Sequence, residues 1–299
     1  MPKSYTVVDD YHDSRLDRWF TKNVINLPHS LIEKIIRQNK VKVNKKRTKS
    51  SYRVQSGDLI EVYDFLKLKP INKEKKIKYK PKKSEVGKYD DYVIEDNENF
   101  IIINKPPGVA VQAGTKSFKN IIDAIKNTKY FMNSNPYTVH RIDKETSGLL
   151  IIAKNRKFAQ LFTSLFRIRK IHKTYLALVY GKVNNSIKTM KDELIYYENN
   201  KKITQKAISN LKIIKSNDGY SFLELNPITG RKHQLRKQLL KIGNPIIGDD
   251  KYFLNDRKII KTKSLMLHAY KIKFMINNVQ YNFKAKYNEA FEYFLNKNF

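Results

Sequence analysis

The stretch from Phe65 to Lys83 limits most strongly how this chain can fold. It holds nine Lys and one acidic residue, together with Pro70 and Pro81. Such a segment is too charged to enter a hydrophobic core, so it should join two separately folded parts. We therefore expect a small domain over residues 1–64, a basic linker over 65–88 and a larger domain over 89–299.

The residues before the linker have the pattern of a compact module of two helices and short strands. Leu16, Trp19, Phe20 and Val24 recur at helical spacing. A second apolar helix follows Pro28, with Ser30 and Glu33 at the spacing of a capping box. The alternation in Val41–Asn44 and the Gly57-Asp58 turn before Leu59–Val62 predict two strands.

The larger domain mixes strand and helix patterns. Successive strands are often not separated by a helix, which favours a mostly antiparallel mixed sheet in an α+β fold. The predicted helices follow Ser117 as a cap, follow Asn155, and cover Glu289–Leu295; the predicted strands are Phe100–Ile103, Gly148–Ala153, Lys173–Tyr180, Ile203–Ile214, Ser221–Leu225, Leu265–Phe274 and Val279–Ala285.

The charge of the chain indicates a polyanionic partner. Sixty Lys and Arg stand against 28 Asp and Glu, which gives a formal net charge of +32. Because 48 of the cations are Lys and only 12 are Arg, part of the excess reflects composition, and each Arg is the more informative residue. No run is apolar enough to span a bilayer and no secretory signal is visible, so we expect a cytoplasmic protein without membrane partners.

The first group of candidate catalytic residues is His140-Arg141-Ile142-Asp143, which leads into an apolar strand. In an extended chain Arg141 and Asp143 point the same way and Ile142 points into the core. A carboxylate beside a guanidinium stays ionised, which suits a nucleophile or a base. An ordinary loop salt bridge explains the same spacing.

Two further groups come later in the chain. Thr229 and Gly230 end a predicted strand and open a predicted helix, and Arg236, one turn into it, could project into a cleft and pair with a carboxylate. A basic helix face in water explains the same pattern. Tyr175 lies on a predicted strand, where a tyrosine is usually part of the core.

From about Phe100 to Tyr252, these motifs and the order in which they occur resemble those of the RluA-type pseudouridine synthases. The motifs that carry the resemblance are Asn104–Gly108, His140–Asp143 with Thr146–Leu150, Lys173–Tyr175, Gly230–Arg236 and Pro245–Asp249. Two departures are conservative: Ile142 and Lys232 stand where the family often has Leu and Thr or Ser. The resemblance implies the pseudouridine synthase fold and isomerisation of uridine in RNA, without a metal or cofactor.

The resemblance also implies roles for individual residues. Asp143 corresponds to the catalytic aspartate, Tyr175 to the active-site tyrosine and Arg236 to the arginine that pairs with the aspartate. Arg141 corresponds to the residue that helps to displace the target base. The other residues expected to bind the substrate are Lys105, Arg231, His233 and Gln234.

The first 64 residues resemble a small α/β S4 RNA-binding domain. From Lys34 to Lys49 there are eight basic residues and no acid, which predicts a face for phosphates, although a solvated surface has the same composition. The expected RNA contacts are Arg15, Arg18, Lys34, Arg37, Lys42, Lys45, Lys46 and Arg47.

The S4-like module and the stretch Val43–Arg47 resemble the RluC-type subgroup that acts on large-subunit ribosomal RNA. The expected partner is therefore 23S rRNA or a large-subunit assembly intermediate, bound by a monomer. The alternatives are a synthase acting on tRNA and a non-catalytic S4-type RNA-binding protein. Two other classes fit less well. A glycosidase would need Glu145 at a set distance from Asp143, and the six His are too scattered for a metal-dependent nuclease.

Overall fold

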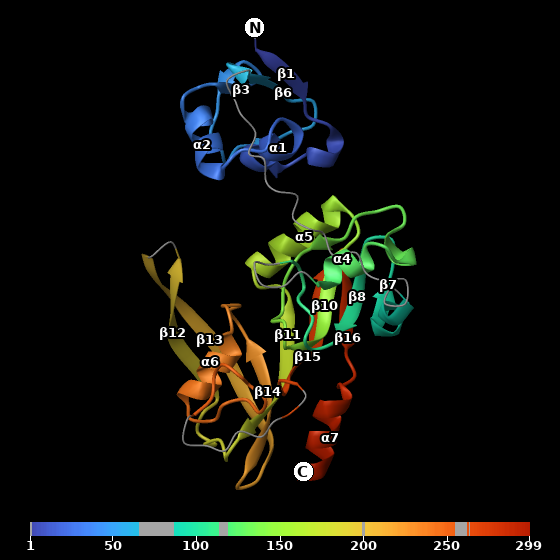
Figure 1. Ribbon diagram of the computed structural model, residues 1–299, viewed down its shortest axis with the longest axis vertical. Helices are drawn as coiled ribbons and strands as arrows, with labels where there is room; N and C mark the ends of the chain where they lie inside the picture. Colours follow the sequence, from blue (N-terminus) through green and yellow to red (C-terminus); the bar gives the residue numbers. More distant parts are fainter. Residues whose placement is uncertain (1, 66–86, 114–118, 199–200, 255–261, 263) are drawn as a thin grey trace. The chain divides into compact units, whose positions relative to one another are not determined.

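The computed structural model describes residues 2–65, 87–113, 119–198, 201–254, 262 and 264–299 (Figure 1). The chain divides into two compact units, Met1–Lys76 and Ile77–Phe299. The predicted linker, 65–88, lies almost entirely outside the described residues. The predicted domain boundaries therefore stay predictions.

The smaller unit combines two helices with short antiparallel strands, as the sequence predicts. Its helices pack Trp19, Phe20 and Ile32 into one buried apolar cluster. Four strands form a sheet in the order β1-β6-β3-β4, and β2 pairs with β5. The elements are β1 (Lys3–Thr6), a 3-10 turn (Asp9–Tyr11), β2 (Ser14–Arg15), α1 (Leu16–Asn23), α2 (His29–Arg37), β3 (Val41–Val43), β4 (Lys46–Arg47), β5 (Arg53–Val54) and β6 (Leu59–Val62).

The start of α2 differs from the prediction. The helix begins at His29 directly after Pro28, and no side chain caps it. Ser30 therefore lies inside the first turn and not at the cap, so the predicted capping box is wrong. Pro28 occupies the N-cap position, and its side chain has no oxygen that could accept an N–H of the first turn.

The larger unit is built on one sheet of ten strands, which confirms the α+β class. The strand order is β12-β13-β14-β11-β15-β10-β8-β7, with β16 beside β15 and β9 beside β10. Every neighbouring pair is antiparallel except β10 with β15. The strands are β7 (Val93–Asp96), β8 (Phe100–Lys105), β9 (Tyr137–Thr138), β10 (Ser147–Ala153), β11 (His172–Tyr180), β12 (Thr189–Glu198), β13 (Lys201–Ser216), β14 (Tyr220–Pro227), β15 (Leu267–Ile276) and β16 (Val279–Lys284).

Helices cover both faces of the sheet around β10, which is buried along all seven residues. Leu150 and Ile152 pack with α4 (Ile121–Ile125), while Leu149 and Ile151 pack with α5 (Arg156–Arg167). The remaining helices are α6 (Gln234–Lys241) and α7 (Glu289–Asn298), with 3-10 turns at Gly87–Tyr92 and Lys129–Phe131. No helix in the described ranges is long and apolar enough to cross a bilayer.

The cap of α4 is Asn120, whose side chain accepts the N–H of Asp123 at 2.9 Å. Ser117, the predicted cap, lies outside the described residues. Asn155 caps α5 as predicted, by accepting the N–H of Phe158.

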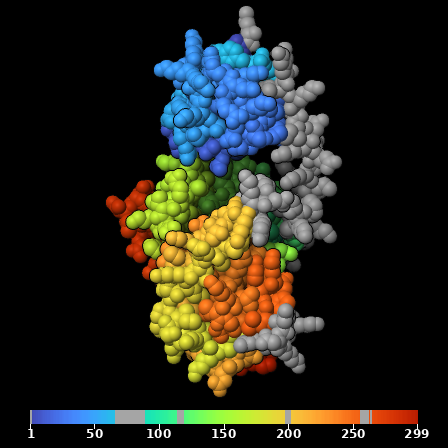
Figure 2. Space-filling view, turned by 90° about the vertical axis from the view of Figure 1, so that its left-hand side faces the viewer, coloured from blue at the N-terminus to red at the C-terminus, as the bar shows by residue number. Residues whose placement is uncertain are grey.

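The hairpin β12–β13 supports α6 from one side (Figure 2, gold and orange). Gln238 of α6 donates to the carbonyls of Met190 and Ala207, and Lys241 contacts Asp192 at 2.6 Å. The sequence pattern predicts β13 but not β12. The two strands pair over ten residue pairs, and the contacts of Gln238 and Lys241 hold α6 against this hairpin.

Gly148 allows β10 and β15 to pack closely at the centre of the sheet. Its φ is +105°, and a Cβ there would lie 2.3 Å from the carbonyl oxygen of Ala269, so only glycine fits. Ala269 on β15 pairs with Gly148 on one side and with Tyr175 on the other. The loop that ends at β10 is therefore held two strands from Tyr175.

Candidate active site

The loop that carries Asp143 connects β9 to β10 and is fixed by His140. The Nε2 atom of His140 accepts the backbone N–H of Ile151 at 2.9 Å, and its ring stacks on Phe166 with centroids 4.6 Å apart. Burial lowers the pKa of His140 to about 3, so the imidazole is neutral at ordinary pH. A neutral ring can keep accepting that N–H, which anchors the loop to the strand.

Burial alternates along the three residues Arg141, Ile142 and Asp143. Ile142 is buried in the core beside β10, and Arg141 is exposed. Asp143 keeps 25% of its side chain accessible. Arg141 makes no ion pair with any residue in the described part of the chain, so the guanidinium that faces Asp143 belongs to another residue.

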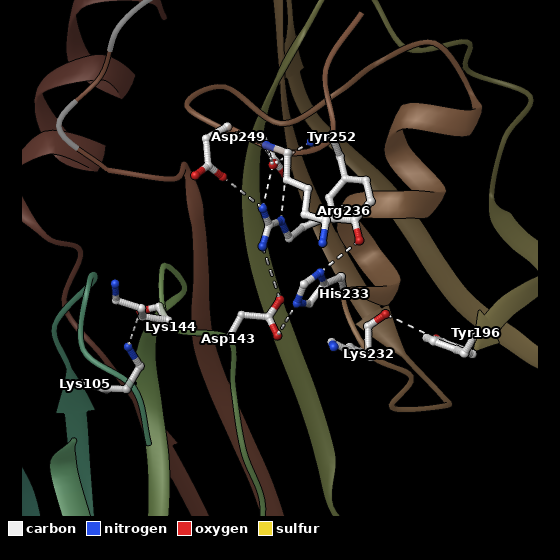
Figure 3. A network of polar contacts seen from close by, with 11 residues as sticks. Lys105, Asp143, Lys144, Tyr196, Lys232, His233, Arg236, Asp249 and Tyr252 are labelled. Atoms are coloured by element: carbon white, nitrogen blue, oxygen red, sulfur yellow. Dashed lines mark hydrogen bonds and ion pairs between the residues drawn. The ribbon is translucent and has the colours of Figure 1, made fainter. Parts of the chain in front are cut away.

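Lys105 lies beneath this loop and not at an open surface. Its side chain is fully buried, and its ammonium donates to the carbonyls of Pro106, Val109 and Lys144 at 2.8, 2.9 and 3.0 Å. Figure 3 shows the contact with Lys144. Burial lowers its pKa to about 7, against the opposing charge of two nearby carboxylates. The structure thus does not bring Lys105 to a substrate, contrary to the predicted binding role. It ties the Pro106 turn to the loop that follows Asp143.

Arg236 on α6 is the guanidinium that faces Asp143. Its Nε and Nη2 atoms donate to both oxygens of the buried Asp249 at 2.7 and 2.6 Å, and Nη1 lies 3.8 Å from Asp143 (Figure 3). Asp250, which is exposed, is 3.5 Å away. Although burial opposes it, the contact with Asp249 raises the pKa of Arg236. The sequence predicts Asp143 as the partner, whereas the structure gives Arg236 a closer and bidentate partner in Asp249.

His233 contacts Asp143 from a second direction. Its Nε2 lies 3.8 Å from Oδ1 of Asp143, and its Nδ1 is 3.0 Å from the hydroxyl of Tyr252. The ring of Tyr252 also lies under the guanidinium of Arg236, at 5.1 Å. Burial lowers the pKa of His233, and the charge of Asp143 opposes that shift. Asp143 is therefore held between an arginine and a histidine whose other contacts fix their orientation.

The turn before α6 is organised by Gln234. Its Oε1 accepts the hydroxyl of Thr229 and the N–H of Arg231, at 2.7 and 3.0 Å. Its Nε2 donates to the carbonyl of Ile208 and the hydroxyl of Ser209, at 3.1 and 2.8 Å. All four hydrogen-bonding positions of the amide are therefore used within the protein. Gln234 shapes the turn and has no position left for a substrate, contrary to its predicted role.

The same turn corrects the predicted start of the helix. Strand β14 ends at Pro227 and α6 begins at Gln234, so Gly230 lies in a turn between them. His233 adopts a left-handed conformation with φ +53° just before the helix. This places its ring toward Asp143, while the side chain of Arg231 donates to the carbonyl of Lys206 at 3.1 Å.

Tyr175 faces the same space from β11. Burial raises its pKa, and the charge of Asp143 acts in the same direction. The phenol is therefore protonated at ordinary pH and presents a neutral ring and a hydroxyl. Unlike Lys105, Tyr175 lines the cavity.

These side chains line a cavity of about 760 Å³. Of the residues expected at the site, the structure brings Asp143, Tyr175, Arg236, Arg141, Arg231, His233 and Gln234 to its wall. Among the described residues of this wall, five are Arg and one is Lys, although the chain has four Lys for each Arg. Planar guanidinium groups suit phosphates and carboxylates, so this enrichment points to an anionic ligand.

Comparison with known proteins agrees with this geometry. The family described as RNA pseudouridylate synthase matches residues 99–241, and the S4 domain family matches residues 26–60. The protein named ribosomal large subunit pseudouridine synthase C from Rickettsia felis is 38% identical over 86% of this chain and 87% of its own length. The chain belongs to the RNA pseudouridylate synthase family.

Other relatives of the synthase give the same result. Ribosomal large subunit pseudouridine synthase C from Vibrio parahaemolyticus is 31% identical over 89% of this chain and 86% of its own length. The solved structure titled Human RNA Pseudouridylate Synthase Domain Containing 4 has a TM-score of 0.61 at 23% identity and covers 71% of this chain and 94% of its own. That likeness confirms the fold of the larger unit.

The cations expected to bind RNA in the smaller unit of the synthase differ in their surroundings. Arg15 is engaged by Asp17 at 2.6 Å, and Lys42 lies 5.0 Å from the ring centre of Tyr63. The others are exposed: Arg18, Lys34, Arg37, Lys45, Lys46 and Arg47. Five of these exposed cations lie on α2 and the β3–β4 hairpin and Arg18 lies on α1, while Arg15 is held in an internal contact.

The sequence patterns do not indicate a role for two residues of the synthase's site. Asp249 ends the motif Pro245–Asp249 and Lys173 begins the motif Lys173–Tyr175, but neither pattern points to what the residue contacts. A signal for Asp249 existed in its Gly-rich loop: Gly248 has φ +77°, and a Cβ there would lie 2.4 Å from the carbonyl of Ser264. Such a constrained loop is suited to holding a buried carboxylate in a fixed place.

Proposed function

We propose that this synthase isomerises uridine to pseudouridine in the RNA of the large ribosomal subunit, with Asp143 acting at the ribose. The observation that supports this most is the placement of Asp143 in the cavity between Arg236 and His233. The names of relatives at 30–38% identity support the large-subunit substrate.

The chemistry needs a carboxylate at the sugar. In pseudouridine, uracil is joined to ribose through C5 instead of N1, so the N1–C1′ bond breaks and a C5–C1′ bond forms. Asp143 can attack C1′ or remove a proton at C2′, and both require an ionised and oriented carboxylate. Arg236 supplies the orientation, since Asp249 fixes its guanidinium before any substrate binds.

The target nucleotide has to leave its stack to reach the cavity, at a cost of a few kcal/mol. Arg141 is exposed at the cavity wall without an ion pair among the described residues, so it is free to fill the vacated position. Tyr175 presents a neutral ring on which the uracil can stack. Once the C5–C1′ bond has formed, the carboxylate of Asp143 can take the proton from C5, and N1 gains a proton.

We further infer that the substrate is 23S rRNA or a large-subunit assembly intermediate and that the protein acts as a monomer in the cytoplasm. Residues of one chain supply the carboxylate and the arginine and histidine beside it, which supports action as a monomer. The exposed cations of the smaller unit suit the backbone of a folded RNA.

Tritium release from RNA labelled at C5 of uridine tests the activity, because C5 loses its hydrogen when the base is reattached. We expect release from large-subunit rRNA and none above background from tRNA. Pseudouridine mapping of rRNA from cells with and without the protein should identify the affected uridines. Unchanged rRNA together with loss of pseudouridine from tRNA would overturn the assignment of the substrate.

A further inference from the structure

The cations of the cavity divide into those with a protein partner and those without one. Arg236 is held by Asp249, and Arg231 donates to the carbonyl of Lys206. Arg167 donates to the hydroxyl of Ser164 at 3.3 Å. Lys173 has no hydrogen bond or ion pair within the described parts of the chain, and it differs from the exposed Arg141 because it is half-buried.

Lys173 lies in the wall between the turn before α6 and the loop of Asp143. Its Nζ is 3.9 Å from the position that a Cβ would take on Gly230. Its charge also acts on the ring of His140 and helps to keep it neutral. The ammonium is therefore enclosed by two parts of the site and is not directed into bulk water.

Burial lowers the pKa of Lys173, and no neighbouring carboxylate compensates for that shift. A partly desolvated charge without a partner destabilises the free protein. Lys105 illustrates the alternative, because it is buried more deeply yet donates to three carbonyls. An unpartnered ammonium that faces a cavity is suited to an anion brought by the ligand.

We propose that Lys173 binds a backbone phosphate of the RNA next to the nucleotide that occupies the cavity. This inference rests on the proposed function, since the anion comes from the RNA substrate. Phosphate oxygens are the most frequent hydrogen-bond acceptors that nucleic acids offer to Lys and Arg. The exposed Arg167 and Arg169 line the same cavity and can continue the track of phosphates away from the site.

A role for Lys173 as an acid or base at the reacting atoms fits the surroundings less well. Asp143 lies on the loop before β10, whereas Lys173 lies on β11 with its ammonium beside Gly230. Both residues line the cavity and they form no ion pair with each other, so the two groups stand on separate parts of its wall. That separation is what a nucleotide needs when its ribose meets one group and its phosphate meets the other.

The test compares Lys173→Met, which keeps the length of the side chain, with Lys173→Arg, which keeps the charge. The matched control is Lys182→Met, at an exposed residue just beyond the other end of the same strand and outside the cavity. Dissociation constants for a large-subunit rRNA transcript are measured over a series of salt concentrations. Circular dichroism melting shows whether each variant is folded.

We expect Lys173→Met to raise Kd and KM about threefold to tenfold and to lower the slope of log Kd against log salt by roughly 0.7 to 0.9, the value for one phosphate contact. The value of kcat should change less than about threefold, as for a contact made before the reaction. Lys173→Arg should restore most of the affinity, and Lys182→Met should resemble the original protein.

A Lys173→Met protein with an unchanged salt slope would overturn the proposal, and so would a large loss of kcat at unchanged Kd. An arginine variant as weak as the methionine variant would show that shape matters and not charge, and would also overturn it. If the original protein releases no tritium, the proposed function fails instead. The binding slopes are measured without the reaction and still decide the role of Lys173.

Discussion

The two units hold their positive charge in different ways. On α2 and the β3–β4 hairpin of the smaller unit, Lys34, Arg37, Lys46 and Arg47 are exposed. In the cavity of the larger unit, Arg236 is 5% exposed and forms two hydrogen bonds to a fully buried carboxylate. Exposed cations attract a polyanion from any direction, whereas a buried bidentate pair fixes one geometry.

This difference separates affinity from chemistry. Exposed charges are screened by salt and contribute to binding in proportion to the phosphates they neutralise. Buried and oriented charges stabilise a particular carboxylate at a particular atom. The smaller unit should therefore determine how tightly RNA binds, and the cavity should determine whether a uridine reacts.

The largest effect is expected from Asp143→Asn. Activity should fall at least about a thousandfold, because the group that acts at the ribose is lost, while the affinity for RNA stays within about threefold. Tritium release and filter binding measure the two quantities. Glu145→Gln, two residues further along, is the control and should retain most activity. Residual activity of Asp143→Asn above a thousandth would contradict the role of this carboxylate.

Arg236→Gln should come next, with kcat lowered about a hundredfold because Asp143 loses its fixed guanidinium. The variant should also unfold more easily, by about 3 kcal/mol, since Asp249 is left buried without its partner. Single-turnover kinetics and denaturant titration measure these effects. Asp250→Asn removes the exposed partner of the same arginine and should change neither value appreciably. If Asp250→Asn lowered kcat and stability as much as Arg236→Gln does, the buried contact with Asp249 would be no more important than the exposed contact with Asp250.

Replacement of Lys34, Arg37, Lys46 and Arg47 by Gln should raise Kd for rRNA about tenfold or more and flatten its salt dependence. The value of kcat at saturating RNA should not change, because none of these residues lines the cavity. Four exposed lysines of the larger unit outside the cavity serve as the charge-matched control: Lys182, Lys188, Lys215 and Lys297. An equal loss of affinity in the control would show that net charge matters and not its location.

The last prediction concerns acid stability. The pKa of His140 is lowered to about 3 in the folded protein, so the unfolded chain binds its proton more readily. The contribution to stability is complete above about pH 6.5 and is lost as the pH falls, by at most about 1.4 kcal/mol per pH unit. His140→Gln should flatten this decline in denaturant titrations followed by circular dichroism.

The single tryptophan gives an internal control for that experiment. Trp19 is buried in the smaller unit, so its fluorescence follows that unit alone. His140→Gln should leave the tryptophan transition unchanged at every pH. A shift of that transition would mean that the two units do not unfold independently.

Much of the fold could be predicted from local patterns. The apolar run at Gly148–Ala153 and the alternation at Val41–Val43 have the periods of a buried strand and a half-buried strand, and both strands are present. The hairpin strand β12 was missed because its alternation is interrupted by charged residues such as Asp192 and Glu193. The predicted capping box in α2 is wrong because the helix begins at His29, which places Ser30 inside the first turn.

By itself, the sequence determined that the chain has two folded parts and that Asp143, Tyr175 and Arg236 belong to one family of motifs. Only the tertiary structure decided that Asp249 is the closer partner of Arg236, that Gln234 is saturated by the turn, and that Lys105 lies beneath the loop. Local periodicity reports which backbone conformation a segment prefers. Contacts between residues that lie far apart in the sequence, such as Asp143 and Arg236, also depend on the register of β10, β15 and β11, which the close packing at Gly148 fixes.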